Sequence, residues 1–88
     1  MEVNWNEDKN KILQEKRWVS FEDIKIAIEE WLIIDILMNS NSKYDNQFLM
    51  IVNINNYAYV VTFIKDEKWF FLKTIFPSRK YTKIYNIS

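Results

Sequence analysis

The basic end of the chain holds the side chains with the clearest chemistry. The last sixteen residues contain no acid and four cations: Lys73, Arg79, Lys80 and Lys83. Ten lysines stand against two arginines in the whole sequence, so an arginine kept at position 79 indicates a need for its planar guanidinium. That group can hold a phosphate through two parallel hydrogen bonds, which an ammonium cannot do. We therefore predict that Arg79 binds phosphate, with a solvated surface arginine as the alternative.

Lys73 and two tyrosines are candidates for proton transfer beside that phosphate. Lys73 is the only charge inside the last apolar segment, where it suits phosphate binding or proton transfer and equally an ordinary strand lysine that reaches solvent. Tyr81 and Tyr85 lie four apart, so a short terminal helix would put both on one side. There either could donate a proton or stack on a base. We favour the alternative that both rings pack down as an apolar end-cap.

Further cations and aromatics could extend such a site. Lys80 and Lys83 belong to the same basic end, and we predict that they contact phosphate. Lys16 and Arg17 are a second pair of candidates, although Lys16 equally suits a solvated helix end and Arg17 cannot act as a base. Trp69 and Phe71 precede Lys73 at alternating positions, on the same predicted face. They could stack on RNA, but we favour burial under a partner protein.

The composition excludes several classes of protein. The 88 residues contain no histidine, cysteine or glycine, which excludes imidazole acid–base chemistry, disulfides, and glycine-rich phosphate loops. The same absences argue against a metal site, and we predict no cofactor. No stretch is long and apolar enough to span a membrane, and the first residues do not resemble a signal peptide. We expect a cytoplasmic protein of one domain covering residues 1–88.

The apolar pattern predicts an α+β fold in two layers. Residues 6–17 are expected to form a helix capped by Asn6, and a second helix follows a capping box at Ser20 with apolar residues at helical spacing up to Trp31. Trp31 and Trp5 are expected in the core. Strands are predicted over residues 32–38, 48–54, 57–64 and 69–76, with a loop over 39–47 and Pro77 ending the last strand. The result is two N-terminal helices on a four-stranded, mainly antiparallel sheet, with a possible short C-terminal helix.

Turn positions predict which residues share a face of that sheet. A two-residue turn at Asn55-Asn56 places Ile54 opposite Tyr57, and a turn at Asp66-Glu67 then continues the same face into the last strand. The face expected to cover the helices carries Phe48, Met50, Val52, Ile54, Tyr57, Tyr59, Val61, Phe63, Phe70, Leu72, Thr74 and Phe76. The opposite, mixed face is expected to hold Lys73 beside Asn53 and Thr62. A one-residue slip would exchange the two faces.

Both ends of the chain resemble the BrnT-type toxins of the RelE/ParE-like group. The first resemblance comes from Trp5-Asn6, Lys9, Lys16 and Val19-Ser20-Phe21-Glu22, spaced like the family signature W-D-x-x-K followed by K-H-G-V-S-F-E. The second comes from residues 73–83, K-T-I-F-P-S-R-K-Y-T-K, which resemble the closing motif R-x-I-S-A-R-K-A-T-K. Departures include Arg17 at the family histidine, Lys73 at the first closing arginine, and one residue inserted before Ser78-Arg79.

The resemblance implies a bacterial toxin of a type II toxin-antitoxin system. Such a protein would be a metal-independent endoribonuclease that inhibits translation, using Lys73, Arg79, Tyr81 and Tyr85 without a histidine pair. The implied partners are RNA, either free or on the ribosome, and a cognate antitoxin, with operator DNA bound only through the antitoxin and no membrane. The alternative is a non-catalytic protein of the same fold that binds partners within a repressor complex.

Overall fold

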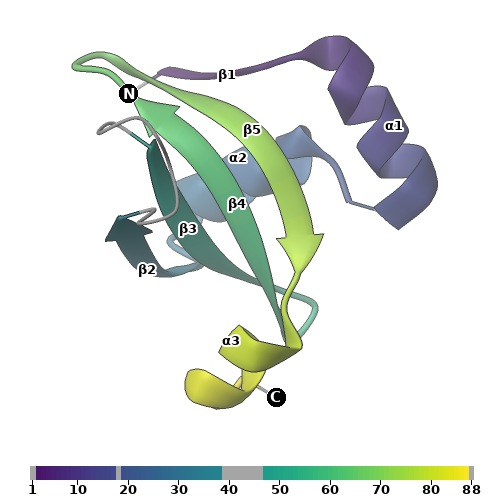
Figure 1. Cartoon of the computed structure of the whole chain (residues 1–88), viewed down its shortest axis with the longest axis vertical. Helices are drawn as coiled ribbons and strands as arrows, with labels where there is room; N and C mark the ends of the chain where they lie inside the picture. The colour runs from purple at the N-terminus through teal and green to yellow at the C-terminus, as the bar shows by residue number, and fades with distance from the viewer. Residues whose placement is uncertain (1, 18, 39–46, 88) are drawn as a thin grey trace.

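A five-stranded sheet carries helices on both faces in the computed structural model, which describes residues 2–17, 19–38 and 47–87 (Figure 1). Within these residues the elements are β1 (Glu2–Trp5), α1 (Glu7–Arg17), α2 (Phe21–Glu29), β2 (Ile33–Met38), β3 (Gln47–Ile54), β4 (Tyr57–Lys65), β5 (Trp69–Pro77) and α3 (Arg79–Ile84). The strand order is β1-β5-β4-β3-β2, with β1 parallel to β5 and the other neighbours antiparallel. The α+β class, the two packed helices and the short terminal helix are confirmed.

The prediction of four strands was wrong, because residues 2–5 form an additional strand. β1 pairs with Trp69–Leu72, the first half of β5, more than sixty residues later in the chain. Val3 and Trp5 alternate with exposed residues and pack against the core. A segment of four residues is too short for its alternating pattern to identify a strand from sequence. Its strand conformation depends on pairing with β5. Residues 39–46 of the predicted loop lie outside the described residues, and Gln47 belongs to β3.

The predicted helix starts are confirmed by their caps. The Asn6 Oδ1 accepts a hydrogen bond of 3.1 Å from the Lys9 backbone N–H at the start of α1. At α2 the Ser20 hydroxyl accepts from the Asp23 N–H at 3.3 Å, and the Asp23 carboxylate accepts from the Ser20 N–H at 2.8 Å. Each bond satisfies a backbone N–H of the first helical turn or of the capping residue, which has no partner within the helix. These bonds define where each helix begins.

The central hairpin follows the predicted register. Ile54 lies opposite Tyr57, and the ladder continues through Val52 opposite Tyr59 to Phe48 opposite Phe63. Asn55 and Asn56 both adopt positive φ angles, of 54° and 63°, as a two-residue turn of this hand requires. In a sequence without glycine, asparagine fills these positions because it tolerates the left-handed region.

A bulge in β5 corrects the predicted faces of that strand. The turn predicted at Asp66-Glu67 lies one residue later, since the Asp66 N–H bonds to the Trp69 carbonyl, and Leu72 therefore lies opposite Phe63 where Phe70 was expected. Phe70 and Leu72 keep the predicted face, but beyond them Thr74, rather than Lys73, lies opposite Thr62. Lys73 is therefore the inserted residue, and every position after it changes face. Ile75 is buried, while Phe76, expected in the core, is exposed. Thr74, also expected on the core face, instead contacts the Thr62 hydroxyl through its own.

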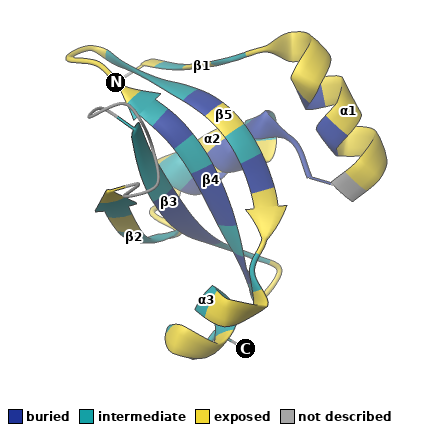
Figure 2. Ribbon diagram, viewed as in Figure 1, coloured by how far each residue is buried: buried dark blue, intermediate teal, exposed yellow. Residues whose placement is uncertain are grey.

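Two apolar clusters lie on opposite faces of the sheet (Figure 2). The larger cluster joins the sheet to α1 and α2 and consists of Leu13, Val19, Phe21, Ile24, Ala27, Met50, Val52, Val61, Phe63, Leu72 and Ile75. The smaller cluster centres on Ile51, Ala58 and Val60, and Tyr81, Tyr85 and Ile87 pack against it. The mixed face is thus partly covered by α3 and the residues that follow it.

The predicted burial of Trp31 was wrong: its side chain is 89% exposed. Because α2 already ends at Glu29, Trp31 lies beyond the helical stripe, with a φ of 60°. Leu32 donates its N–H to the Ala27 carbonyl at 2.9 Å and Trp31 donates to that of Ile28 at 3.4 Å. This pair of bonds is a Schellman motif, in which glycine normally occupies the left-handed position. Trp5 does pack against the core, stacked on Phe21 with ring centroids 6.0 Å apart.

A buried asparagine joins α1 to the start of α2. Asn10 is fully buried, and its Oδ1 accepts a 2.7 Å hydrogen bond from the Phe21 N–H. Its Nδ2 donates to both carboxylate oxygens of Glu22, at 2.7 and 2.8 Å, and to Glu7 at 3.2 Å. Glu7 also accepts from the Trp5 indole N–H at 3.0 Å. The hydrogen bonds from Asn10 and then Trp5 lower the pKa of the Glu7 carboxyl.

Replacing Asn10 with leucine tests this junction. The Asn10→Leu change leaves the Phe21 N–H and the Glu22 carboxylate without their buried partner, so we expect the free energy of unfolding to fall by about 2–3 kcal/mol. Urea denaturation followed by circular dichroism measures it. Asn4→Leu, the same change at an exposed asparagine of β1, is the control and should stay within about 0.5 kcal/mol of the parent. Equal losses in the two variants would contradict a specific role for the junction.

Replacing Trp31 tests the strain at the end of α2. Trp31→Gly removes the Cβ that disfavours the left-handed conformation, so we expect about 1 kcal/mol of added stability and a rise in Tm of roughly 4–8 °C. Trp31→Ala is the control, because it removes the indole and keeps the Cβ. If alanine stabilises the protein as much as glycine, the gain comes from removing the exposed ring and not from relieving the backbone.

Candidate functional site

The terminal helix α3 is fixed to the end of the β4–β5 ladder by a set of short hydrogen bonds. Ser78 donates its N–H to the Ala58 carbonyl at 2.9 Å, and its hydroxyl caps α3 by accepting from the Tyr81 N–H at 3.1 Å. The Thr82 hydroxyl accepts from the Ala58 N–H at 2.9 Å and donates to the Ser78 carbonyl at 2.7 Å. Both backbone groups of Ala58 are therefore satisfied by the α3 segment, which places the helix at the end of the sheet (Figure 1).

Three of the cations predicted to bind phosphate lie on α3. Arg79, Lys80 and Lys83 are all exposed on this one helix. Among the described residues, no hydrogen bond or ion pair engages the Arg79 guanidinium, so its donors face solvent. The Lys80 Nζ lies 5.4 Å from the centroid of the Tyr81 ring. The helix thus presents a cationic surface, with an aromatic ring at its border, that can take an anion.

The two tyrosines of this segment differ in their hydroxyl groups. Their rings stack at 6.1 Å and both pack against the smaller apolar cluster, as expected for an end-cap. The Tyr85 hydroxyl donates to the Asp35 Oδ2 at 2.7 Å. This hydrogen bond, followed by desolvation and the negative charge of Asp35, raises the pKa of Tyr85 above its ordinary value. No described group holds the Tyr81 hydroxyl, so Tyr81 is the better placed of the two to donate a proton to a ligand.

Lys73 lies with the aromatic residues of β5, apart from the cations of α3. Its Nζ is 5.6 Å from the centroid of the Phe71 ring, and Trp69 meets Phe71 edge to face at 6.3 Å. Trp69 and Phe71 are half-buried, whereas Lys73 is exposed at the bulge. Of the residues predicted for the site, the structure therefore groups Lys73 with Phe71 and Trp69, and groups Arg79 with Lys80, Lys83 and Tyr81.

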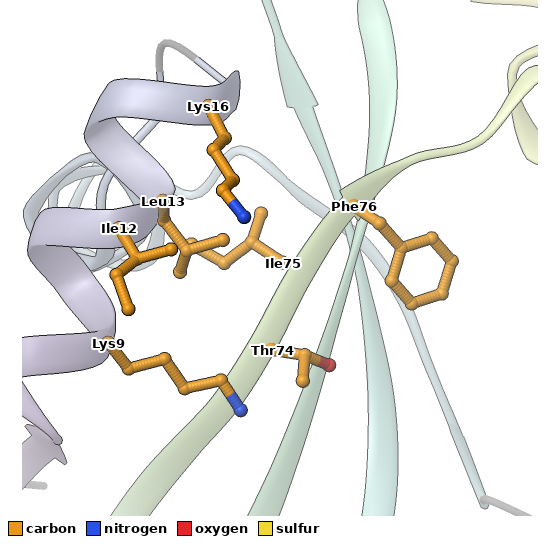
Figure 3. Close-up of a pocket in the computed structure, with 7 residues that line it drawn as sticks. All are labelled: Lys9, Ile12, Leu13, Lys16, Thr74, Ile75 and Phe76. Carbon is orange, nitrogen blue, oxygen red and sulfur yellow. The ribbon is translucent and has the colours of Figure 1, made fainter.

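Lys16 belongs to a third location, a groove between α1 and β5 (Figure 3). The groove has a volume of about 460 Å³ and also contains Lys9, Thr74 and Phe76, none of which was singled out as a site residue. The spacing of Lys9, Ile12, Leu13 and Lys16 would have revealed this face, since residues three, four and seven apart share one side of a helix. Arg17 ends α1, and its side chain lies outside the described part of the structure.

Asp35 was not identified as a site residue from the sequence either. It lies in the middle of the apolar strand β2, opposite Ile51 and on the same face as Tyr85. No cluster of three or more potential metal-binding side chains occurs among the described residues, and none of their helices is long and apolar enough to cross a membrane.

The Tyr85–Asp35 contact predicts a loss of stability at alkaline pH. Because the pKa of Tyr85 is raised in the folded state, the stabilisation is present below the ordinary pKa of 10.0 and is lost as the pH rises through the raised value. We expect stability to fall more steeply with pH above this point in the parent than in Tyr85→Phe. Denaturation curves at stepped alkaline pH measure the difference. Tyr57→Phe, on the other face of the sheet, is the control, and parallel curves for all three proteins would contradict the assignment.

Comparison of the chain with protein-family models, with curated proteins and with solved structures found no match in any of the three.

Proposed function

We propose that this chain is the toxin of a bacterial type II toxin-antitoxin system, a cytoplasmic endoribonuclease with a RelE-like fold that inhibits translation. The observation that carries the proposal is the cationic surface of α3, where Arg79, Lys80 and Lys83 are exposed beside Tyr81. The last sixteen residues contain no acid to oppose a polyanion. The motif resemblance at both ends of the chain adds the expectation of RNA as that polyanion.

The proposed reaction is attack of a ribose 2′-oxygen on the adjacent phosphorus, with cleavage of the bond to the 5′-oxygen. Arg79 binds the oxygens of the scissile phosphate, where negative charge increases in the transition state. Tyr81 gives its proton to the departing 5′-oxygen, and Lys73 is the proposed acceptor of the 2′-hydroxyl proton or a contact to a neighbouring phosphate. Lys80, Lys83, Lys16 and Arg17 are assigned to flanking phosphates. The mechanism uses no metal ion or cofactor.

The proposed partner of this toxin is an antitoxin that covers Trp69, Phe71 and the basic end of the chain. Half-buried aromatic rings next to exposed cations suit a protein partner that carries apolar and acidic groups, because complementary charge speeds association. Operator DNA would be bound only through the antitoxin.

Two observations favour a second candidate, a partner-binding protein of the same fold without catalysis. The Tyr85 hydroxyl is engaged by Asp35 and is the weaker acid for it, and no contact joins Lys73 to Arg79. A surface that only binds an anionic partner needs neither a free Tyr85 hydroxyl nor a lysine close to Arg79, because no proton is transferred. In this candidate the chain acts within a repressor complex with the antitoxin and DNA.

An alanine at position 79 tests the ribonuclease directly. In the parent protein we expect growth arrest on induction and RNA cleavage that persists in EDTA. Arg79→Ala should reduce cleavage on the order of 10²–10³, because one charged donor to the scissile phosphate is lost. Lys65→Ala, an exposed lysine at the end of β4, is the matched control and should cleave like the parent. Circular dichroism confirms that each variant is folded.

Three results separate the candidates. A folded Arg79→Ala that cleaves like the parent would show that the active-site assignment is wrong. A parent that binds RNA or a neighbouring gene product without cleaving RNA supports the non-catalytic candidate. Tyr81→Phe should slow cleavage far more than Tyr85→Phe, since only Tyr81 has a hydroxyl free to reach a ligand.

A further inference from the structure

The groove between α1 and β5 combines an apolar floor with two cations (Figure 3). Its α1 wall is the face formed by Lys9, Ile12, Leu13 and Lys16, and its other wall is Thr74–Phe76 of β5. Leu13 and Ile75 are buried at the base, whereas Ile12 and Phe76 are exposed. Both lysines are exposed, and none of the described residues that line the groove is acidic. Such a site suits a ligand that has apolar groups and negative charges together.

The same groove borders an open edge of the sheet. β1 covers the outer edge of β5 only from Trp69 to Leu72, because the chain then leaves Trp5 and enters α1. Beyond Leu72, no described strand pairs with β5 on that side, although β4 pairs with it on the other side as far as Pro77. Backbone donors and acceptors on an unpaired edge are a template for an additional strand.

From the open edge and the two lysines together, we propose that this groove binds an extended, acidic segment of a partner protein as a strand added beside Thr74–Pro77. Backbone hydrogen bonds to the edge would supply affinity, and alternate side chains would point into the groove. An apolar side chain would lie against Ile12, Leu13 and Ile75, and carboxylates on either side of it would reach Lys9 and Lys16 (Figure 3). RNA is the less suitable occupant, because most of the lining side chains are apolar and an added strand uses a peptide backbone.

The spacing of the lysines limits the pattern of the segment. Lys9 and Lys16 are seven residues apart on a helix, which corresponds to about 10 Å along its axis. A strand covers that distance in about three residues. Flexible lysine side chains extend the range, and side chains that enter one groove alternate along a strand. The expected pattern is therefore two acidic residues four positions apart, with an apolar residue midway between them. The inference does not rest on the proposed ribonuclease, of whose assigned residues Lys16 alone lines this groove, and its test has no activity readout.

Selection from a displayed library of short random peptides on the full chain tests the proposal. We expect enriched peptides with the acidic–apolar–acidic pattern. A synthetic copy of the strongest binder, labelled with a fluorophore, should bind Lys9→Glu/Lys16→Glu at least about tenfold more weakly than the parent. Lys25→Glu/Lys65→Glu changes the net charge equally at exposed lysines outside the groove and should bind like the parent.

Two further measurements place the peptide. Ile12→Glu should weaken binding, whereas Ile26→Glu, an equally exposed isoleucine on α2, should not (51% and 50% exposed). The Ser78 N–H bonds to β4, and direction alternates along the strand, so the amides of residues 74 and 76 also face β4 and the Ile75 amide faces the open edge. Hydrogen exchange of the Ile75 amide should therefore slow when the peptide is bound. The proposal is overturned if selection yields no binders or binders without acidic residues, or if the groove variants bind as tightly as the parent. It is also overturned if an oligouridine RNA, rather than any peptide, binds the groove with dependence on Lys9 and Lys16.

Discussion

The buried amide of Asn10 is the interaction on which the N-terminal half of the structure depends. Of the described α1 side chains, only Asn10 and Leu13 are buried, so apolar packing alone fixes this helix weakly. The Asn10 amide adds to this packing, because it accepts a hydrogen bond from the first N–H of α2 and donates to Glu22. Glu7 extends the network back to Trp5 and hence to β1. A buried polar network of this kind specifies one arrangement, because any other leaves its members unpaired.

The bulge at Lys73 has a comparable effect on the other half of the molecule. Before it, β5 pairs with β1 and presents Phe70 and Leu72 to the core, and after it Ile75 takes that role. The exchange of faces puts Ile75 at the base of the groove and Phe76 on the opposite face of the sheet, and it brings Ser78 into line with Ala58, where α3 begins. One inserted residue therefore determines both the shape of the groove and the attachment of the cationic helix.

Features governed by neighbouring residues were predictable from the sequence, and features governed by distant ones were not. The Asn6 cap, the Ser20–Asp23 box, the Asn55-Asn56 turn and the strand end at Pro77 all follow from interactions within a few residues. The bulge has no local signature, because Lys73 suits either face of an exposed strand. Trp31 was misplaced because helical spacing was extended past the end of α2. The bonds made by Asn10 and Asp35 cross 11 and 50 positions of the chain, so no sequence pattern reports them.

The same contrast holds for the candidate site. Clustering of Arg79, Lys80 and Lys83 followed from their closeness in sequence, and the short helix was expected. The difference between the Tyr81 and Tyr85 hydroxyl groups could not be predicted, because it depends on Asp35 of β2. The grouping of Lys73 with Phe71 depends on the path of β5 through the bulge.

The parallel pairing of β1 with β5 also has a consequence for synthesis of the chain. Residues 2–5 leave the ribosome more than sixty residues before their strand partners, residues 69–72. The hairpins of β3, β4 and β5 can close as soon as they are synthesised, because they join neighbouring segments. The apolar residues of β1 stay uncovered until β5 has emerged. Pairing of β1 with β5 then closes a loop that contains α1, α2 and the strands β2 to β4. Completion of the sheet at that edge is therefore a late event, in which the nascent N-terminal segment is open to chaperones and to any partner able to bind it.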